Sequence, residues 1–334
     1  MPIDLPTVWA GIIAFAVLAY VVLDGFDLGI GILFPFFPDR HERDLMTNSI
    51  APVWDGNETW LVLGGGGLMA VFPVAYATVL PALYIPIILM LLGLIFRGVA
   101  FEFRWRTQRA SHYWDYGFCI GSTIAGFTQG IALGALVQGI HIVDREYAGG
   151  WWDWLSPFSV LTGIAVVVGY ALLGACWLNL KTLGDIQQKA RRMATGTGVL
   201  MLVLIGVVSL WSPFINPVYF DRWFGWPTAF FSAFVPLLIA GCAFALWHGL
   251  TTDKHLQPFL AALGLFILSF VGLGISFYPY IVPGSITIEE AAAPDSSLLF
   301  LLVGAVVLVP TILAYTGYAY WVFRGKMDPD EGYH

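Results

Sequence analysis

The sequence of 334 residues has few charged side chains. They make up 11% of it, whereas a soluble globular domain carries about 25%. Hydrophobic residues make up 58%, and the mean hydropathy is +0.78. Because so few polar side chains cannot cover a chain of this length in water, the composition excludes a soluble enzyme.

Basic residues and cysteines are also scarce. There are 15 Lys and Arg against 22 Asp and Glu, so no basic face for nucleic acid is expected. The three cysteines, Cys119, Cys176 and Cys242, lie in apolar runs without paired spacing, which predicts small core residues and neither disulfides nor metal ligands. The many aromatic residues suit a protein anchored at two membrane interfaces. The class that remains is a polytopic integral membrane protein.

Nine apolar segments are candidates to cross a bilayer, which takes about 20 helical residues. They lie near Val8–Phe34, Trp60–Phe72, Val79–Phe101, Tyr113–Ile140, Phe158–Leu180, Thr197–Trp211, Thr228–Trp247, Pro258–Tyr278 and Leu298–Phe323. The second is short and contains the run Gly64–Gly67. Close helix packing is the favoured role of these glycines, and a broken helix around a cavity is the alternative.

The basic residues test this count, because cytoplasmic loops carry an excess of Lys and Arg. With nine spans and the N-terminus outside, thirteen of the 15 fall on the inner side, and only Arg145 and Arg222 fall outside. The thirteen are Arg40, Arg43, Arg97, Arg104, Arg106, Arg109, Lys181, Lys189, Arg191, Arg192, Lys254, Arg324 and Lys326. We therefore predict a single integral membrane domain over residues 1–334, with the C-terminus in the cytoplasm.

Four acidic residues lie in the first two spans, where a charge is costly and indicates function by default. Asp24 and Asp27 are in the inner half of the first span, and Asp55 and Glu58 are at the inner end of the second. Each pair has i, i+3 spacing, which puts both carboxyls on one helix face. Carboxyl groups in such surroundings can exchange protons near neutral pH, as a proton-conducting chain requires. The alternative is that they cap helix ends or pair with basic residues such as Arg97 and Arg104.

The histidines predict that this chain binds no haem. Five lie in loops or at the terminus and one ends a span: His41, His112, His141, His255, His334 and, at the span end, His248. A bis-histidine haem site needs two of them inside the membrane on different spans. Met69 and Met90 could be axial ligands in principle, but methionine in a membrane helix is usually a packing residue. No metal site is expected.

Four segments of the sequence carry recognisable motifs. They are Asp24-Gly-Phe-Asp27-Leu-Gly-Ile-Gly31, the stretch from Ser49 to Gly67 with Trp54-Asp55-Gly-Asn57-Glu58-Thr-Trp at its centre, Ile95-Phe-Arg97-Gly-Val-Ala-Phe-Glu102-Phe-Arg104, and Val309–Trp321. Together they resemble subunit II of the cytochrome bd quinol oxidases, from the first span to the last. The short length and loops are similar to the cyanide-insensitive branch of that family.

The resemblance implies a haem-free subunit of a quinol:oxygen oxidoreductase in the aerobic respiratory chain of the bacterial inner membrane. Its obligate partner, subunit I, carries haems b and d and oxidises quinol with dioxygen as the acceptor, so no catalytic residue is expected here. The fold is all-α, with about nine transmembrane helices in two four-helix bundles plus one peripheral helix. Small accessory subunits and a structural quinone occur in some members, and the sequence assigns no residues to them.

The family's proton-pathway aspartate matches Asp55. We extend the role to Glu58, Asp24 and Asp27 on geometry alone, with Asn57, Trp54 and Arg97 as supporting residues. This chain would then scaffold subunit I and contribute a cytoplasmic proton-uptake pathway.

Two other functions compete with this one. A stand-alone proton-coupled secondary transporter could use Gly64–Gly67 as its broken helix. That function predicts an inverted repeat, whereas the acid-rich motif occurs only in the N-terminal quarter. The second alternative is a purely structural membrane subunit whose acids only cap helices.

Overall fold

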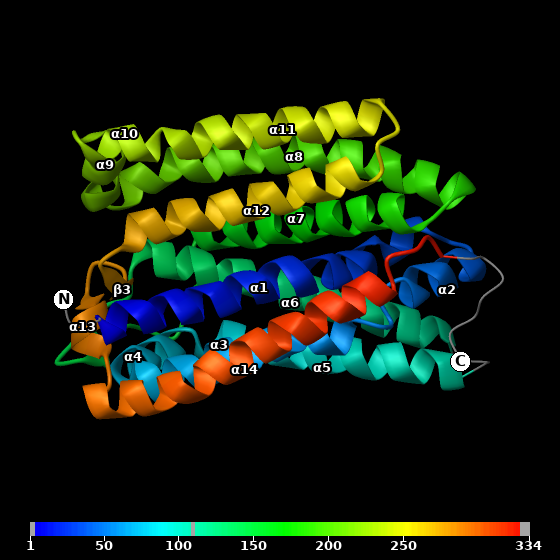
Figure 1. Ribbon diagram of the computed structural model, residues 1–334. Coiled ribbons are helices and arrows are strands. Elements are labelled where there is room, and N and C mark those ends of the chain that lie inside the picture. The colour runs from blue at the N-terminus through cyan, green and yellow to red at the C-terminus, as the bar shows by residue number, and fades with distance from the viewer. Residues whose placement is uncertain (1–3, 108–110, 328–334) are drawn as a thin grey trace.

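The computed structural model describes residues 4–107 and 111–327, and almost all of its elements are helices (Figure 1). In this described part, eight helical segments are long and apolar enough to cross a membrane. They are α1 (Leu5–Leu33), α5 (Tyr84–Arg106), α6 (Ser111–Gln138), α7 (Pro157–Lys181), α8 (Gly184–Ile215), α11 (Phe234–Thr251) with the short α10 (Thr228–Ser232) before it, α12 (Leu256–Phe277) and α14 (Asp295–Val322). The prediction of an all-α polytopic membrane protein is confirmed.

A bent pair of helices is the candidate for the ninth span. Helix α3 (Trp54–Val71) has 18 residues and is about 27 Å long, close to the thickness of the hydrocarbon layer. Helix α4 (Pro73–Ala82) leaves it at 119°. The break falls at Phe72 because the following Pro73 has no N–H and disfavours a helical conformation in the residue before it.

The four consecutive glycines stay inside α3, so the helix is not broken there. A Cβ added at Gly64 would lie 3.2 Å from Val17, and one at Gly67 would lie 3.4 Å from Ile13, both on α1. One added at Gly65 or Gly66 would meet nothing within 4 Å. Half of the run therefore packs against α1, as the close-packing interpretation expects.

Several short elements connect the spans. They are η1 (Phe34–Phe36), α2 (Arg40–Asn48), α9 (Pro217–Phe224), α13 (Ile288–Ala291) and two antiparallel hairpins, β1 (Ile142–Val143) with β2 (Glu146–Tyr147) and β3 (Tyr280–Val282) with β4 (Ile286–Thr287). None of them could be predicted from the sequence, because segments this short leave no measurable periodicity.

The spans form two groups of four. Helices α1, α3, α5 and α6 pack together as bundle 1, and α7, α8, α11 and α12 pack together as bundle 2. Helix α14 crosses the outside of bundle 1, where it contacts α1 and α3 (Figure 1). This confirms the predicted arrangement of two four-helix bundles plus one peripheral helix.

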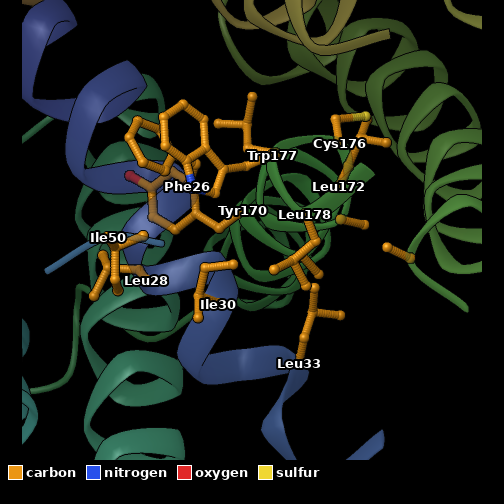
Figure 2. Packing of buried hydrophobic residues seen from close by; sticks show 14 of the residues in the cluster. Phe26, Leu28, Ile30, Leu33, Ile50, Tyr170, Leu172, Cys176, Trp177 and Leu178 are labelled. Carbon is orange, nitrogen blue, oxygen red and sulfur yellow. The ribbon is translucent and has the colours of Figure 1, made fainter. Parts of the chain in front are cut away.

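The two bundles meet along α7, which packs against both α6 and α1. At the α1 contact the backbones come closest. A Cβ on Gly29 would overlap the carbonyl oxygen of Tyr170, and one on Gly174 would lie 2.6 Å from the carbonyl carbon of Gly29, so the two backbones touch. Beside this contact the Phe26 ring stacks on Trp177, with ring centroids 4.3 Å apart (Figure 2). Small residues thus let the helices approach, and large aromatic side chains fill the space next to them.

Two boundary predictions were wrong. Helix α8 begins at Gly184, well before Thr197, because it continues past the apolar segment into a charged turn. There Lys189 pairs with Glu42, and Arg191 pairs with Asp253. The second error concerns Arg97, which the charge count placed in an inner loop. It lies within α5 and its side chain is fully buried.

The remaining basic residues keep their asymmetry. Those predicted on the inner side lie on α2, at the C-terminal ends of α5 and α7, early in α8, between α11 and α12, and after α14. Figure 1 shows these ends together at one end of the molecule, while α9, which carries Arg222, lies at the other. Arg109 and His334 lie outside the described residues. The side on which the cytoplasm lies stays a prediction.

Candidate functional site

A buried ion-pair cluster lies inside bundle 1, with Arg97 at its centre. One guanidinium nitrogen of Arg97 is 2.7 Å from an Asp24 oxygen and 3.9 Å from an Asp27 oxygen, and the other is 2.5 Å from Glu58. The side chains of Arg97, Asp24 and Asp27 are 0% exposed, and that of Glu58 is 29% exposed. We call these four residues, from α1, α3 and α5, the acid cluster.

The segment of α1 from Asp24 to Gly29 has two faces, which contact different helices. Asp24 and Asp27 point to Arg97 on α5. Gly25 and Gly29 face α7 instead, where a Cβ on Gly25 would lie 2.7 Å from the Tyr170 ring. Alternation of acid and glycine along the helix therefore holds the carboxyls against α5 while the opposite face packs closely on bundle 2.

The acid cluster contains more acids than bases. One guanidinium cannot balance three carboxylates in an interior of low dielectric constant, where an unpaired charge is costly. In addition, Asp24 Oδ2 and Asp27 Oδ1 are buried and make no hydrogen bond among the described residues. A buried group of this kind can bind and release protons, which is the chemistry that the arrangement permits.

Of the three predicted supporting residues, Arg97 is part of the acid cluster, and Asn57 and Trp54 contact it. The side-chain amide of Asn57 donates to Asp27 at 2.7 Å. The Arg97 guanidinium lies over the Trp54 ring, 5.0 Å from its centroid, a distance at which a cation is attracted to an indole face. Trp54 and Asn57 thus hold Arg97 and Asp27 in place from α3.

Asp55 lies apart from the acid cluster. It is exposed on α3, one turn before Glu58, and makes no hydrogen bond or ion pair within residues 4–107 and 111–327. The four acids that the sequence singled out are therefore layered. Asp55 is outermost, Glu58 is half-covered, and Asp24 and Asp27 are fully buried.

The alternative for the four acids was that they pair with basic residues such as Arg97 and Arg104. Of these two bases, only Arg97 pairs with them. Arg97 pairs with Asp24 and Glu58, whereas Arg104 pairs with Asp44 and Asp115, each at 2.6 Å. Arg43 also binds Asp115, at 2.8 Å. This second network joins α2 to the ends of α5 and α6 and is separate from the acid cluster.

Four polar residues near the acid cluster were missed by the sequence analysis. The Gln129 amide donates to the Tyr20 hydroxyl at 2.9 Å, and Tyr170 donates to the Gln129 carbonyl at 2.5 Å. The Tyr20 hydroxyl is a neighbour of the Asp24 carboxyl. On the other side, Tyr320 of α14 donates to the Asn57 carbonyl at 3.0 Å. An amide in the middle of an apolar segment could have singled out Gln129, but tyrosines look like interface anchors.

The described histidines lie away from the middle of the spans. His41 is on α2, His112 is in the first turn of α6, and His141 is in a loop. His248 and His255 lie on either side of the turn between α11 and α12, where each hydrogen bonds a glutamine through Nδ1. Within the described ranges, no three His, Cys, Asp or Glu side chains are arranged to hold a metal ion.

Comparisons with known proteins agree along the whole chain. The family model for cytochrome bd terminal oxidase subunit II matches residues 5–323. The chain is 30% identical to cytochrome bd-I ubiquinol oxidase subunit 2 of Escherichia coli K12, over 97% of this chain and 95% of that one. It is also 30% identical to cytochrome bd ubiquinol oxidase subunit 2 of Bacillus subtilis 168, over 98% of both.

The fold is shared with a solved structure. A chain of the bd oxidase from Geobacillus thermodenitrificans superposes with a TM-score of 0.82, covering 96% of this chain and 99% of that one at 16% identity. The family match over nearly all of the sequence, the two relatives and this shared multi-pass fold lead to one assignment. The chain belongs to the cytochrome bd terminal oxidase subunit II family.

Proposed function

We propose that this chain is the haem-free subunit II of a quinol:oxygen oxidoreductase that serves aerobic respiration in the bacterial inner membrane. The complex would oxidise quinol, reduce dioxygen to water, and pair this chain with subunit I in an obligate heterodimer. Support comes from the family assignment and from relatives whose names describe the second subunit of a ubiquinol oxidase.

The described histidines do not suit a bis-histidine haem inside the membrane part of this chain, because they sit at helix ends or in loops. Of the methionines, Met69 is 59% exposed, whereas Met90 and Met201 pack in the apolar interior, the usual role of methionine in a membrane helix. We therefore assign haems b and d to subunit I. A structural quinone in this chain and small accessory subunits stay predictions without assigned residues.

The acid cluster is the observation that carries the proton role. Asp55 would take a proton at the surface of α3 and pass it to Glu58, which contacts Arg97 and so adjoins Asp24 and Asp27. The basic residues at this end of the molecule favour the cytoplasm as the source. Bundle 2 has no such cluster among its described residues, and we assign it the scaffolding role.

The Asp55→Asn substitution tests the proton role. We expect it to lower oxygen consumption by the quinol-fed complex while the haem absorption spectrum of the complex stays intact, because only proton delivery is affected. Asp185→Asn is the matched control, since Asp185 is an exposed aspartate in the first turn of α8. Unchanged turnover in Asp55→Asn would show that Asp55 is not on the path.

Purification separates this function from that of a stand-alone transporter. An obligate oxidase subunit should bring down a haem-bearing partner, whereas a transporter should be colourless and sufficient by itself. A transporter of this size would also place related sites in both halves. The acid cluster occupies bundle 1, and the four helices of bundle 2 bury no acidic side chain in the described part of the chain.

A further inference from the structure

Two series of neighbouring polar side chains lead from the acid cluster into the rest of the subunit, and each passes through an amide. The first runs from Asp27 through Asn57 to Tyr320 on α14. The second runs from Asp24 past Tyr20 to Gln129 on α6 and then to Tyr170 on α7. The order of groups is the same in both directions, namely acid, amide and tyrosine, with one extra hydroxyl in the second.

The two amides also point the same way. Gln129 accepts from Tyr170 through its carbonyl and turns its NH2 group toward Tyr20. Asn57 accepts from Tyr320 through its carbonyl and turns its NH2 group toward Asp27. The NH2 group of Asn57 is held further, because it donates a second hydrogen bond to the Leu23 carbonyl. The acid cluster therefore meets a donor directly at Asn57, and Tyr20 beside it meets a donor at Gln129.

An amide oriented in this way does not pass a proton on. A carboxyl or a hydroxyl can release one proton and accept another, but the NH2 group of a carboxamide is a donor without an acceptor site. A proton leaving Asp27 or Tyr20 toward these side chains finds no oxygen to receive it. Tyr170 and Tyr320 are thus hydrogen bonded to the same network but separated from its acids.

Only one carboxyl of the acid cluster reaches the surface. Glu58 is 29% exposed, while Asp24 and Asp27 are 0% exposed. The titratable groups around the cluster are Tyr20 on α1, Asp55 on α3, Tyr170 on α7 and Tyr320 on α14, and α6 contributes the amide of Gln129. Of these, Asp55 lies beside Glu58 on the exposed side of α3.

We propose that Asn57 and Gln129 are amide stops, by which we mean carboxamide side chains that block proton transfer. Asn57 blocks transfer from the acid cluster to α14, and Gln129 blocks transfer to bundle 2. Protons then enter and leave the acid cluster through Glu58 on α3. The inference rests on the proposed proton role and adds its boundary. The acid cluster is then closed toward α14 and bundle 2, and Glu58 is the group through which it exchanges protons with the rest of the uptake pathway.

The proposal is tested in the purified complex with subunit I. One set of substitutions changes Glu58 in the acid cluster, and the other changes the tyrosines beyond the two amides. Glu58→Gln keeps a hydrogen bond to Arg97 but cannot carry a proton. We expect it to lower quinol-driven oxygen consumption by about tenfold or more, since a positioned proton-transfer group contributes a factor of roughly 10² to 10⁴. Glu58→Asp keeps the carboxyl and should retain more turnover than Glu58→Gln.

The matched variants lie beyond the stops. Tyr170→Phe and Tyr320→Phe each remove one hydroxyl, and we expect turnover within about twofold of the parent with the same pH profile, as for residues outside the transition state. Haem absorbance per complex is measured for every variant, so that poor assembly is not mistaken for slow turnover. Tyr320 lies on the peripheral α14, which keeps one of the two variants informative if the buried Tyr170→Phe assembles poorly.

The outcomes separate this proposal from the proposed function. If either tyrosine variant lowers turnover as far as Glu58→Gln and shifts the pH profile at normal haem content, protons cross an amide and the stops are refuted. If Asp55→Asn lowers turnover but Glu58→Gln does not, protons do not enter the acid cluster through Glu58, and the proposal is refuted. If neither acid variant has an effect, the proton role itself fails.

Discussion

The two bundles share an architecture but differ in what fills them. Bundle 1 buries Arg97 with Asp24 and Asp27, all at 0% exposure. On the described helices of bundle 2, the one buried charged side chain is Lys181, the last residue of α7, and the interior is packed with residues such as Leu172 and Leu265. One four-helix frame can therefore serve as an apolar scaffold or can enclose buried charges, depending on a few interior positions.

The charge in bundle 1 is tolerated because it is shared. Each buried carboxyl has a donor from a different helix, namely Arg97 from α5 for Asp24 and Asn57 from α3 for Asp27. Removing one member of such a set leaves the others unpaired in a medium of low dielectric constant. The described part of bundle 2 has no comparable cluster of buried charges, and most of its buried residues are apolar.

The largest effect on assembly is expected from Arg97→Gln. This substitution removes the only base of the acid cluster, and with it the charge balance that distinguishes the interior of bundle 1 from that of bundle 2. Leaving buried carboxylates without a counter-charge costs about 3–5 kcal/mol, so we expect little assembled complex in the membrane. The measurement is the amount of complex, from immunoblot and haem absorbance. Arg106→Gln is the matched control, because Arg106 is an exposed residue in the last turn of the same helix.

A double variant shows whether charge is the cause. Adding Asp24→Asn to Arg97→Gln removes one of the uncompensated carboxyls and should recover part of the lost complex. If the double variant assembles no better than Arg97→Gln, loss of packing and not loss of charge balance explains the defect.

A smaller effect is expected from Gly29→Ala, which probes the contact that joins the two bundles. The new methyl group would overlap the carbonyl of Tyr170, so α1 and α7 must move apart at a cost of about 1–3 kcal/mol. Thermal unfolding of the purified complex measures this as a lower Tm. Gly11→Ala on the same helix meets nothing within 4 Å, and the better helix propensity of alanine should leave its Tm equal or higher. Equal Tm changes in the two variants would contradict the close-contact role of Gly29.

The smallest effect is expected outside both bundles, at Glu290 on α13. Hydrogen bonds from the backbone N–H and the hydroxyl of Thr287 lower the pKa of this exposed carboxyl. A lowered pKa in the folded state means that the stabilisation is present above the unfolded value of about 4.3 and is lost as the pH falls through the folded value. Glu290→Gln should therefore differ slightly from the parent in Tm at neutral pH and match it in acid.

The neighbouring residue supplies the control for that pH dependence. Glu289 is exposed on the same short helix and is not part of the capping box of Thr287 and Glu290. Glu289→Gln should leave the pH dependence of Tm unchanged. A pH dependence that disappears equally in both variants would show that the cap does not produce it.

Much of the fold could be predicted from the sequence. Apolar runs separated by charged or turn-forming residues are local signals, and they predicted the spans and the multi-pass class. The same signals misplaced the start of α8, because hydropathy marks the membrane part of a helix and not its end at Gly184. The hairpins and α2 (Arg40–Asn48) left no such signal, since they are short and lie in polar connections.

The candidate site was only partly predictable. Asp24 and Asp27 stand out in the sequence because an acid in an apolar run is rare, and their spacing correctly put both on one face of α1. Arg97 was counted as a loop residue, since a base near the end of an apolar segment looks the same whether it faces water or a carboxylate. Gln129 and Tyr320 could not be linked to the acids at all, because α6 and α14 are far from α1 in the chain.

The sequence alone determined that this protein is a multi-pass membrane protein, which segments are apolar enough to cross, and which few acids lie inside. These properties follow from the cost of placing each residue in hydrocarbon, which depends on the residue and its immediate neighbours. Tertiary structure decided that Arg97 joins Asp24 to Glu58, that Asp55 stays outside, and that the amides of Asn57 and Gln129 lie between the acid side of the network and the tyrosines Tyr320 and Tyr170. Those facts depend on which helix faces meet, and that is set by packing between segments distant in the chain.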